Sequence, residues 1–140
     1  MNDVLRLPEP EPEWDSALRY QGENRNPVRQ VSLWARSDGF KEAAVMRVLF
    51  SDVVRRLRLR AEESWDDLGA VEVATFRLRG IDFAVSHPTS DEGLTSVFLK
   101  GVLAEEERRD AVLQLLTVLA VDWSAIEFWR SSDGTYVPQR

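Results

Sequence analysis

The residues best suited to chemistry lie around a single histidine. His87 is the only imidazole in the chain, and Asp91 and Glu92 follow it closely. A histidine beside two carboxylates can serve as a general base or a metal ligand. Metal sites, however, usually combine several His or Cys ligands at set spacings such as H-E-x-x-H, and the chain has no such motif. We therefore interpret His87 as an ordinary residue at a strand end and expect no metal site. A small enzyme that uses His87 with these carboxylates is the alternative.

Other catalytic machinery has little support in the sequence. Ser86 and Ser90 lie outside any G-x-S-x-G motif, and the seven glycines form no phosphate-binding loop. The absence of cysteine excludes disulfides, thiolate metal sites and a cysteine nucleophile. Adjacent acids such as Glu62/Glu63 are more typical of a solvated surface than of an acid–base pair. The sequence thus predicts no catalytic residue and no cofactor.

The charge distribution favours a protein partner over nucleic acid. The formal net charge is −6 and the isoelectric point is near 4.9. A run of arginines at residues 55–60 is followed at once by acids at residues 62–67, which indicates a face of intramolecular ion pairs. An acidic chain is poorly suited to a phosphate backbone, whereas it attracts basic proteins. We expect a basic protein partner and no binding to nucleic acid.

Composition predicts one domain with a distinct N-terminal tail. The 140 residues are 44% hydrophobic, which is enough for a single core. Residues 1–27 are rich in Pro and Glu, a composition typical of an extended, mobile segment, and residues 28–140 form the expected domain. No apolar stretch has the length of a secretory leader or a membrane span. These features predict a cytoplasmic protein without a membrane partner.

Hydrophobic periodicity predicts an α+β fold. Residues 28–35 alternate as a strand does, and residues 40–63 show a helical stripe that includes Leu57 but not Arg56. The later elements are strands at 71–79, 81–85, 94–100 and 126–129, a helix at 105–121, and a short sixth strand at 136–137. The resulting order is β-α-β-β-β-α-β. It predicts a two-layer sandwich in which an antiparallel-rich sheet of five or six strands carries both helices on one face.

Aromatic residues indicate where a partner would bind. Trp34 and Trp129 alternate with Leu33 and Phe128, so one core face cannot accommodate all four. If the sheet face without helices is open, both tryptophans lie on it, and exposed aromatic patches often mark interfaces. The candidate partner-binding residues are Trp34, Trp129, Phe76, Phe98 and Trp14. Alternatively, Trp14 and Tyr20 of the tail cover that face of their own domain.

Two resemblances suggest the kind of binding. From the long helix onward, the expected element order resembles that of bacterial type III secretion chaperones, which are small and acidic. A small acidic domain also resembles the immunity proteins that neutralise toxins by charge and shape. Both resemblances imply a non-enzymatic module that sequesters another protein, and the immunity-type role is our first expectation.

Overall fold

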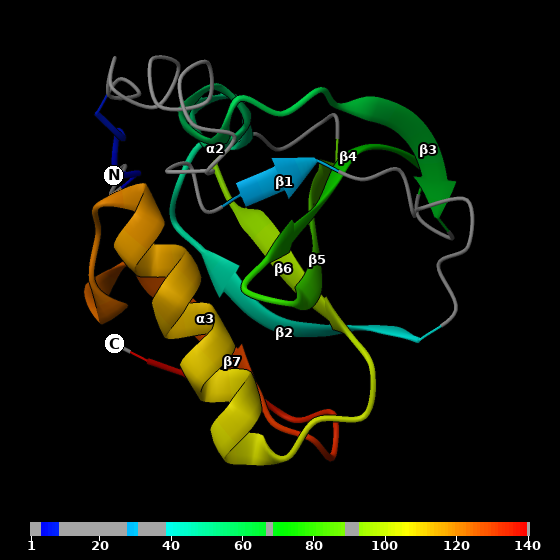
Figure 1. Ribbon diagram of the computed structural model, residues 1–140, viewed down its shortest axis with the longest axis vertical. Helices are drawn as coiled ribbons and strands as arrows, with labels where there is room; N and C mark the ends of the chain where they lie inside the picture. Colours follow the sequence, from blue (N-terminus) through cyan, green and yellow to red (C-terminus); the bar gives the residue numbers. More distant parts are fainter. Residues whose placement is uncertain (1–3, 9–27, 31–38, 67–68, 89–92, 140) are drawn as a thin grey trace.

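The computed structural model describes residues 4–8, 28–30, 39–66, 69–88 and 93–139 (Figure 1). Within these residues it is an α+β fold with one antiparallel sheet of eight strands and two helices. A single turn of 3-10 helix, Trp123–Ala125, precedes β7. The strands are β1 (Val28–Gln30), β2 (Phe40–Met46), β3 (Glu62–Asp66), β4 (Gly69–Leu78), β5 (Ile81–Pro88), β6 (Thr95–Lys100), β7 (Ile126–Arg130) and β8 (Tyr136–Pro138), and the helices are α2 (Phe50–Leu57) and α3 (Glu105–Leu119).

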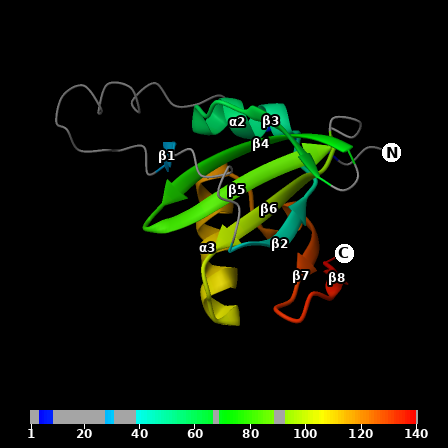
Figure 2. The same ribbon diagram turned by 90° about the vertical axis from the view of Figure 1, so that its right-hand side faces the viewer.

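The sheet is built around the hairpin of β4 and β5. The strand order is β1-β4-β5-β6-β2-β7-β8, and β3 pairs with β4 beyond the end of β1. Arg79 and Gly80 form the hairpin turn with φ angles of 51° and 83°, the left-handed values that a tight two-residue turn requires. Figure 2 shows this long hairpin beside β6, with β7 and β8 at the opposite end of the sheet. The predicted hairpin at this point is confirmed.

The predicted helix at residues 40–63 is wrong. The chain forms β2 first, then only eight residues of helix in α2, and then β3. β2 pairs with β6 on one side and β7 on the other, and its residues 43–46 are all apolar. Such a short apolar run matches a helical stripe as well as a strand. α2 ends at Leu57, and the next residue, Arg58, has a left-handed φ of 57°. Eight strands therefore replace the expected five or six, and the predicted order lacks β3 and the early β2.

The other predicted elements within the described residues agree with the structure. β4 to β8 and α3 match the expected strands and second helix within a few residues. β1 covers residues 28–30 of the strand expected at 28–35, and residues 31–38 lie outside the described part of the chain.

Both helices pack into one core with a single face of the sheet. Phe76 and Phe83 stack at its centre with ring centroids 5.1 Å apart and almost no exposed surface. Leu57 of α2 and Leu115 of α3 enter the same cluster. Arg56, expected on the solvent side, is buried, and its Nε donates to the carbonyl of Val118 at 3.2 Å. This hydrogen bond joins the two helices directly.

The centre of the opposite sheet face is also buried. Val73 and Ala84 have no exposed surface although they alternate with core residues and point away from the helices. Thr75 and Ser86 beside them are buried as well. Of the two alternatives for this face, open or covered, its centre is therefore covered.

The first described segment is attached to the domain. Leu7 is buried in the core, and the Leu5 amide donates to the Arg47 carbonyl at 2.8 Å. Arg6 binds the buried carboxylate of Asp52 at 2.6 Å. Residues 4–8 thus differ from the mobile tail expected over residues 1–27, while residues 9–27 lie outside the described part.

Candidate functional site

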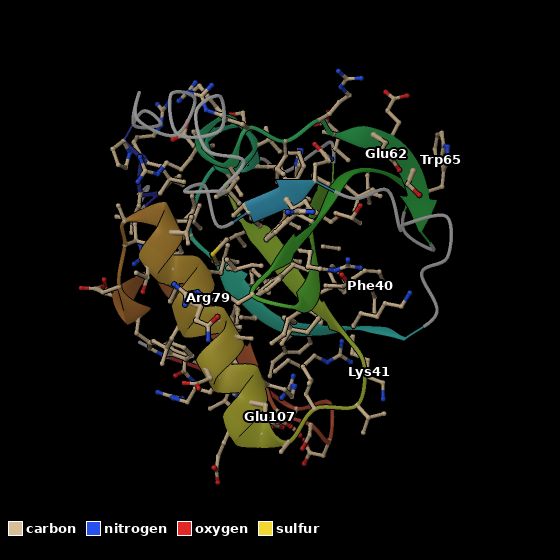
Figure 3. The ribbon with its side chains drawn as sticks, viewed as in Figure 1. Phe40, Lys41, Glu62, Trp65, Arg79 and Glu107 are labelled. Atoms are coloured by element: carbon tan, nitrogen blue, oxygen red, sulfur yellow. The ribbon has the colours of Figure 1, made fainter. Side chains whose placement is uncertain are left out.

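The most exposed aromatic side chain of the described residues is on β3. Trp65 keeps 77% of its surface exposed, and Figure 3 shows it at the margin of the molecule. Its partner across the ladder is Ala70 of β4, whose small side chain leaves the indole uncovered. Glu63 lies two residues earlier on the same face of β3. An exposed tryptophan beside a carboxylate is a surface suited to recognition.

A second carboxylate completes this surface. Glu72 of β4 is directly opposite Glu63 in the register and is diagonal to Trp65. We call Glu63, Trp65 and Glu72 the acidic tryptophan patch. Two carboxylates that face each other across a ladder repel, so the sequence places an unfavourable pair here. A cation from a partner would relieve that repulsion.

His87 lies beside the patch on the neighbouring strand, β5. It is opposite Glu72 in β5, and its Nε2 lies 2.8 Å from Glu72 Oε1. The imidazole is only 3% exposed and packs on the Phe50 ring of α2 at a centroid distance of 4.5 Å. His87 therefore orients Glu72 and joins the patch to the start of α2.

The alternative of an enzyme that uses His87 with Asp91 and Glu92 involves residues outside the described part of the chain. Asp91 and Glu92 lie there, and among the described residues the Glu72 carboxylate contacts His87. No group of three His, Cys, Asp or Glu side chains in the described ranges is placed to hold a metal ion. The contact between Glu72 and His87 could not be predicted from the sequence, because the two residues are 15 positions apart and meet only through strand pairing.

The predicted partner-binding aromatics occupy different environments. Phe76 has no exposed surface and so presents no atom to a partner. Trp129 is also in the core, and its indole N–H donates to Glu105 Oε2 at 2.6 Å. The expected sides of Trp129 and Phe128 are thus reversed, since Phe128 is half-buried and lies outside the core cluster. Phe98 is half-buried, and Trp14 and Trp34 lie outside the described residues.

Trp65 itself was not singled out by its sequence. The predicted helix ends at residue 63, and Trp65 lies just beyond it among acids and a serine. The alternation of Glu63 and Trp65 on one face was the available signal.

The arginines of α2 are engaged within the molecule. Arg55 pairs with Asp52 at 2.7 Å, and Arg56 binds a backbone carbonyl of α3. Arg47, just before the helix, pairs with Glu127 at 3.2 Å. Arg47 and Arg55 thus form intramolecular ion pairs with acids other than those of the expected run at residues 62–67.

Comparisons of the chain with protein-family models, curated proteins and solved structures found no match. None of the helices in the described ranges is long and apolar enough to cross a membrane.

Proposed function

We propose that the protein is a non-enzymatic binding module that holds a basic segment of another protein on the acidic tryptophan patch. The observation that carries the proposal is Trp65, which is 77% exposed on the same sheet face as two carboxylates. A lysine or arginine above the indole would gain a cation–π contact, and Glu63 and Glu72 would supply counter-charges on either side. Tryptophan is among the residues that most often dominate binding energy at interfaces.

The net charge also favours a basic partner. A chain of −6 attracts a basic protein over distances comparable to the Debye length, which is about 10 Å at 0.1 M salt. Such attraction raises the association rate, whereas the aromatic contact governs dissociation. The proposal therefore separates the role of the whole charge from that of Trp65.

Two biological roles fit this chemistry. An immunity-type protein would cover a basic functional surface of a folded partner, and a secretion-chaperone-type protein would hold a basic segment in extended form. We favour the immunity-type role because the patch is compact and lies on a single pair of strands. Hydrogen exchange of the captured partner distinguishes them, because only the chaperone-type role keeps the bound segment unprotected beyond the contact.

The test uses affinity capture followed by surface plasmon resonance. Full-length protein, Trp65→Ala and Leu113→Ala serve as baits in a native lysate; Leu113 is an exposed apolar residue of α3, remote in sequence from the patch. We expect a basic partner that is retained by the wild type and by Leu113→Ala and lost by Trp65→Ala. With the purified pair, Trp65→Ala should raise the dissociation rate about tenfold or more.

Salt provides the second readout. The association rate should fall as salt rises from low ionic strength, while the dissociation rate changes less. A stoichiometric partner that binds Trp65→Ala with the wild-type dissociation rate would place the interface elsewhere. An association rate that does not change with ionic strength would contradict the electrostatic part of the proposal.

A further inference from the structure

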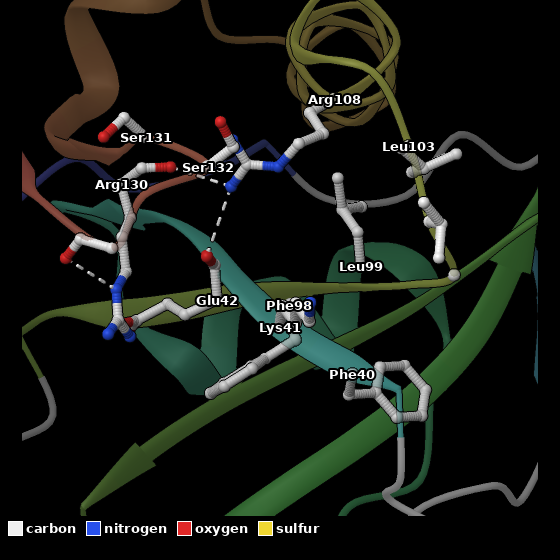
Figure 4. A pocket seen from close by; sticks show the side chains of 13 residues that line it. Phe40, Lys41, Glu42, Phe98, Leu99, Leu103, Arg108, Arg130, Ser131 and Ser132 are labelled. Atoms are coloured by element: carbon white, nitrogen blue, oxygen red, sulfur yellow. Dashed lines mark hydrogen bonds and ion pairs between the residues drawn. The ribbon is translucent and has the colours of Figure 1, made fainter.

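A groove of about 500 Å³ lies away from the acidic tryptophan patch. It is bounded by the start of β2, the end of β6, the loop from β6 into α3, and the turn between β7 and β8 (Figure 4). This volume is within the range of pockets that hold small molecules. Its lining divides into a cationic part and an apolar part.

The cationic part comprises Lys41, Arg108 and Arg130. Glu42 is the acid that lines the groove, and Glu105, outside the lining, pairs with Arg108. Arg108 is fixed: its Nη2 donates to the carbonyls of Arg130 and Glu42 at 2.7 and 3.4 Å, and its Nη1 donates to Glu105 at 2.8 Å. Arg130 is held by Glu42 at 3.3 Å and by the Gly134 carbonyl at 3.2 Å. The positive charges are thus positioned in advance.

Lys41 differs from the two arginines. It is exposed and makes no ion pair with any residue in the described ranges. Glu42 is committed elsewhere, because it also accepts a hydrogen bond from the Tyr136 hydroxyl. The groove therefore carries a cation whose charge is not neutralised by its own walls.

The apolar part lies toward the other end of the groove. Phe40, Phe98 and Leu103 are half-buried and line this part of the groove (Figure 4). Val102, on the same loop, is fully exposed. Half-buried aromatic and aliphatic groups beside fixed cations match an amphipathic anion rather than an inorganic ion.

We propose that this groove binds a small organic carboxylate with a flat apolar body. The carboxylate would pair with Lys41, and the apolar body would lie along the apolar part of the groove. This site is independent of the proposed protein partner, because no residue of the acidic tryptophan patch lines the groove.

The experiment titrates the full-length protein with 3-phenylpropionate and follows the backbone amides by two-dimensional NMR. The neutral analogue 3-phenylpropionamide has the same body without the charge. We expect saturable shifts at residues 40–42, 98–103 and 130–134, with a dissociation constant on the order of 1 mM for a ligand of this size. The amide should bind at least about fivefold more weakly.

Lys41→Gln and the matched variant Arg29→Gln complete the test. Arg29 is an exposed cation on β1, outside the groove. Lys41→Gln should weaken the binding of 3-phenylpropionate about fivefold without changing the melting temperature, and Arg29→Gln should leave it within about twofold. The proposal is overturned if the wild type shows no saturable shifts at these amides, if the amide binds as well as the acid, or if Lys41→Gln binds like the wild type.

Discussion

The two helices pack on the same face of the sheet, yet they are attached by opposite arrangements of charge. α2 carries a buried carboxylate, Asp52, whose arginine partners Arg6 and Arg55 keep 64% and 47% of their side chains exposed. α3 carries a buried guanidinium, Arg108, whose partners include two backbone carbonyls. α2 also buries Arg56, which binds a carbonyl of α3, so the difference between the two helices is the buried acid of α2.

This difference determines how each attachment responds to change. A carboxylate can be neutralised by a proton, and its partner Arg6 belongs to a segment more than forty residues away in the sequence. A guanidinium stays charged at every accessible pH, and carbonyl acceptors do not titrate. The attachment of α2 should therefore depend on pH and on the N-terminal segment, whereas that of α3 should respond to pH only through the Glu105 carboxylate that also pairs with Arg108.

The apolar contribution of α2 should exceed its ionic one. Leu57→Ala should lower the free energy of unfolding by about 2–5 kcal/mol, because the side chain is 1% exposed and its loss leaves a cavity. Leu113→Ala on α3 is the control, since Leu113 is 40% exposed and should cost less than about 1 kcal/mol. Urea denaturation measures both. Equal small losses would show that α2 contributes little to the core.

Removing the Arg108 contacts that attach α3 should cause the next largest loss of unfolding free energy. Arg108→Ala should cost about 2–3 kcal/mol, because two carbonyls lose a charged donor and the Trp129 ring loses the guanidinium 5.1 Å from its centroid. Arg109→Ala is the neighbouring control, since its guanidinium lies over Trp123 at an exposed position. It should cost less than about 1 kcal/mol. If both variants lose the same free energy in urea, Arg108 is not the anchor of α3.

Glu105 shows how tightly the start of α3 is held. Burial alone raises the pKa of this carboxyl, but hydrogen bonds from Trp129 and Arg108 and the charge of Arg108 outweigh it, and the pKa lies below its ordinary value. The Glu107 carboxylate also accepts the Ala104 amide at 2.8 Å, which satisfies one of the N–H groups at the helix start.

The elements that could be predicted were those in which local and tertiary preferences agree. α3 has acids in its first turn and a sustained apolar pattern, and the β4–β5 hairpin has a turn residue pair that admits positive φ. The predicted helix at residues 40–63 was wrong because strand pairing determines the structure of this segment. The helical stripe from Ala43 to Leu57 is real, but β6 and β7 pair with its first part.

The candidate site was less predictable than the fold for the same reason. The acidic tryptophan patch joins residues 63, 65 and 72, whose proximity depends on the β3–β4 register. Nor could alternation alone decide which face of β7 meets the helices, because Trp129 and Phe128 are both apolar. The indole N–H of Trp129 finds its acceptor in Glu105, which stabilises Trp129 on the helix side.

Removing the ionic contact between α2 and the N-terminal segment should cause the smallest loss of unfolding free energy, and this loss should depend on pH. The hydrogen bond from Arg6 is the main reason why the pKa of Asp52 lies below its ordinary 3.8, and burial opposes it only in part. Asp52→Asn should cost about 1–2 kcal/mol at pH 7, reduced from the value for a buried pair because both arginines are partly solvated.

The direction of the pH dependence follows from that lowered pKa. The unfolded chain takes up a proton at Asp52 near pH 3.8, before the folded chain does, so the contribution of Asp52 is complete above about pH 5 and is lost as the pH falls through the folded pKa. The difference in unfolding free energy between wild type and Asp52→Asn should therefore shrink from pH 7 to pH 3. Arg6→Gln and the double variant complete a thermodynamic cycle, in which the coupling free energy between Arg6 and Asp52 should shrink over the same pH range.

Arg108→Ala, measured alongside, should keep a larger part of its loss of unfolding free energy at pH 3, because the carbonyl acceptors of Arg108 do not titrate. A coupling between Arg6 and Asp52 that stays constant from pH 7 to pH 3 would show that the carboxylate charge does not attach α2, and the contrast between the two helices would then reduce to their apolar contacts.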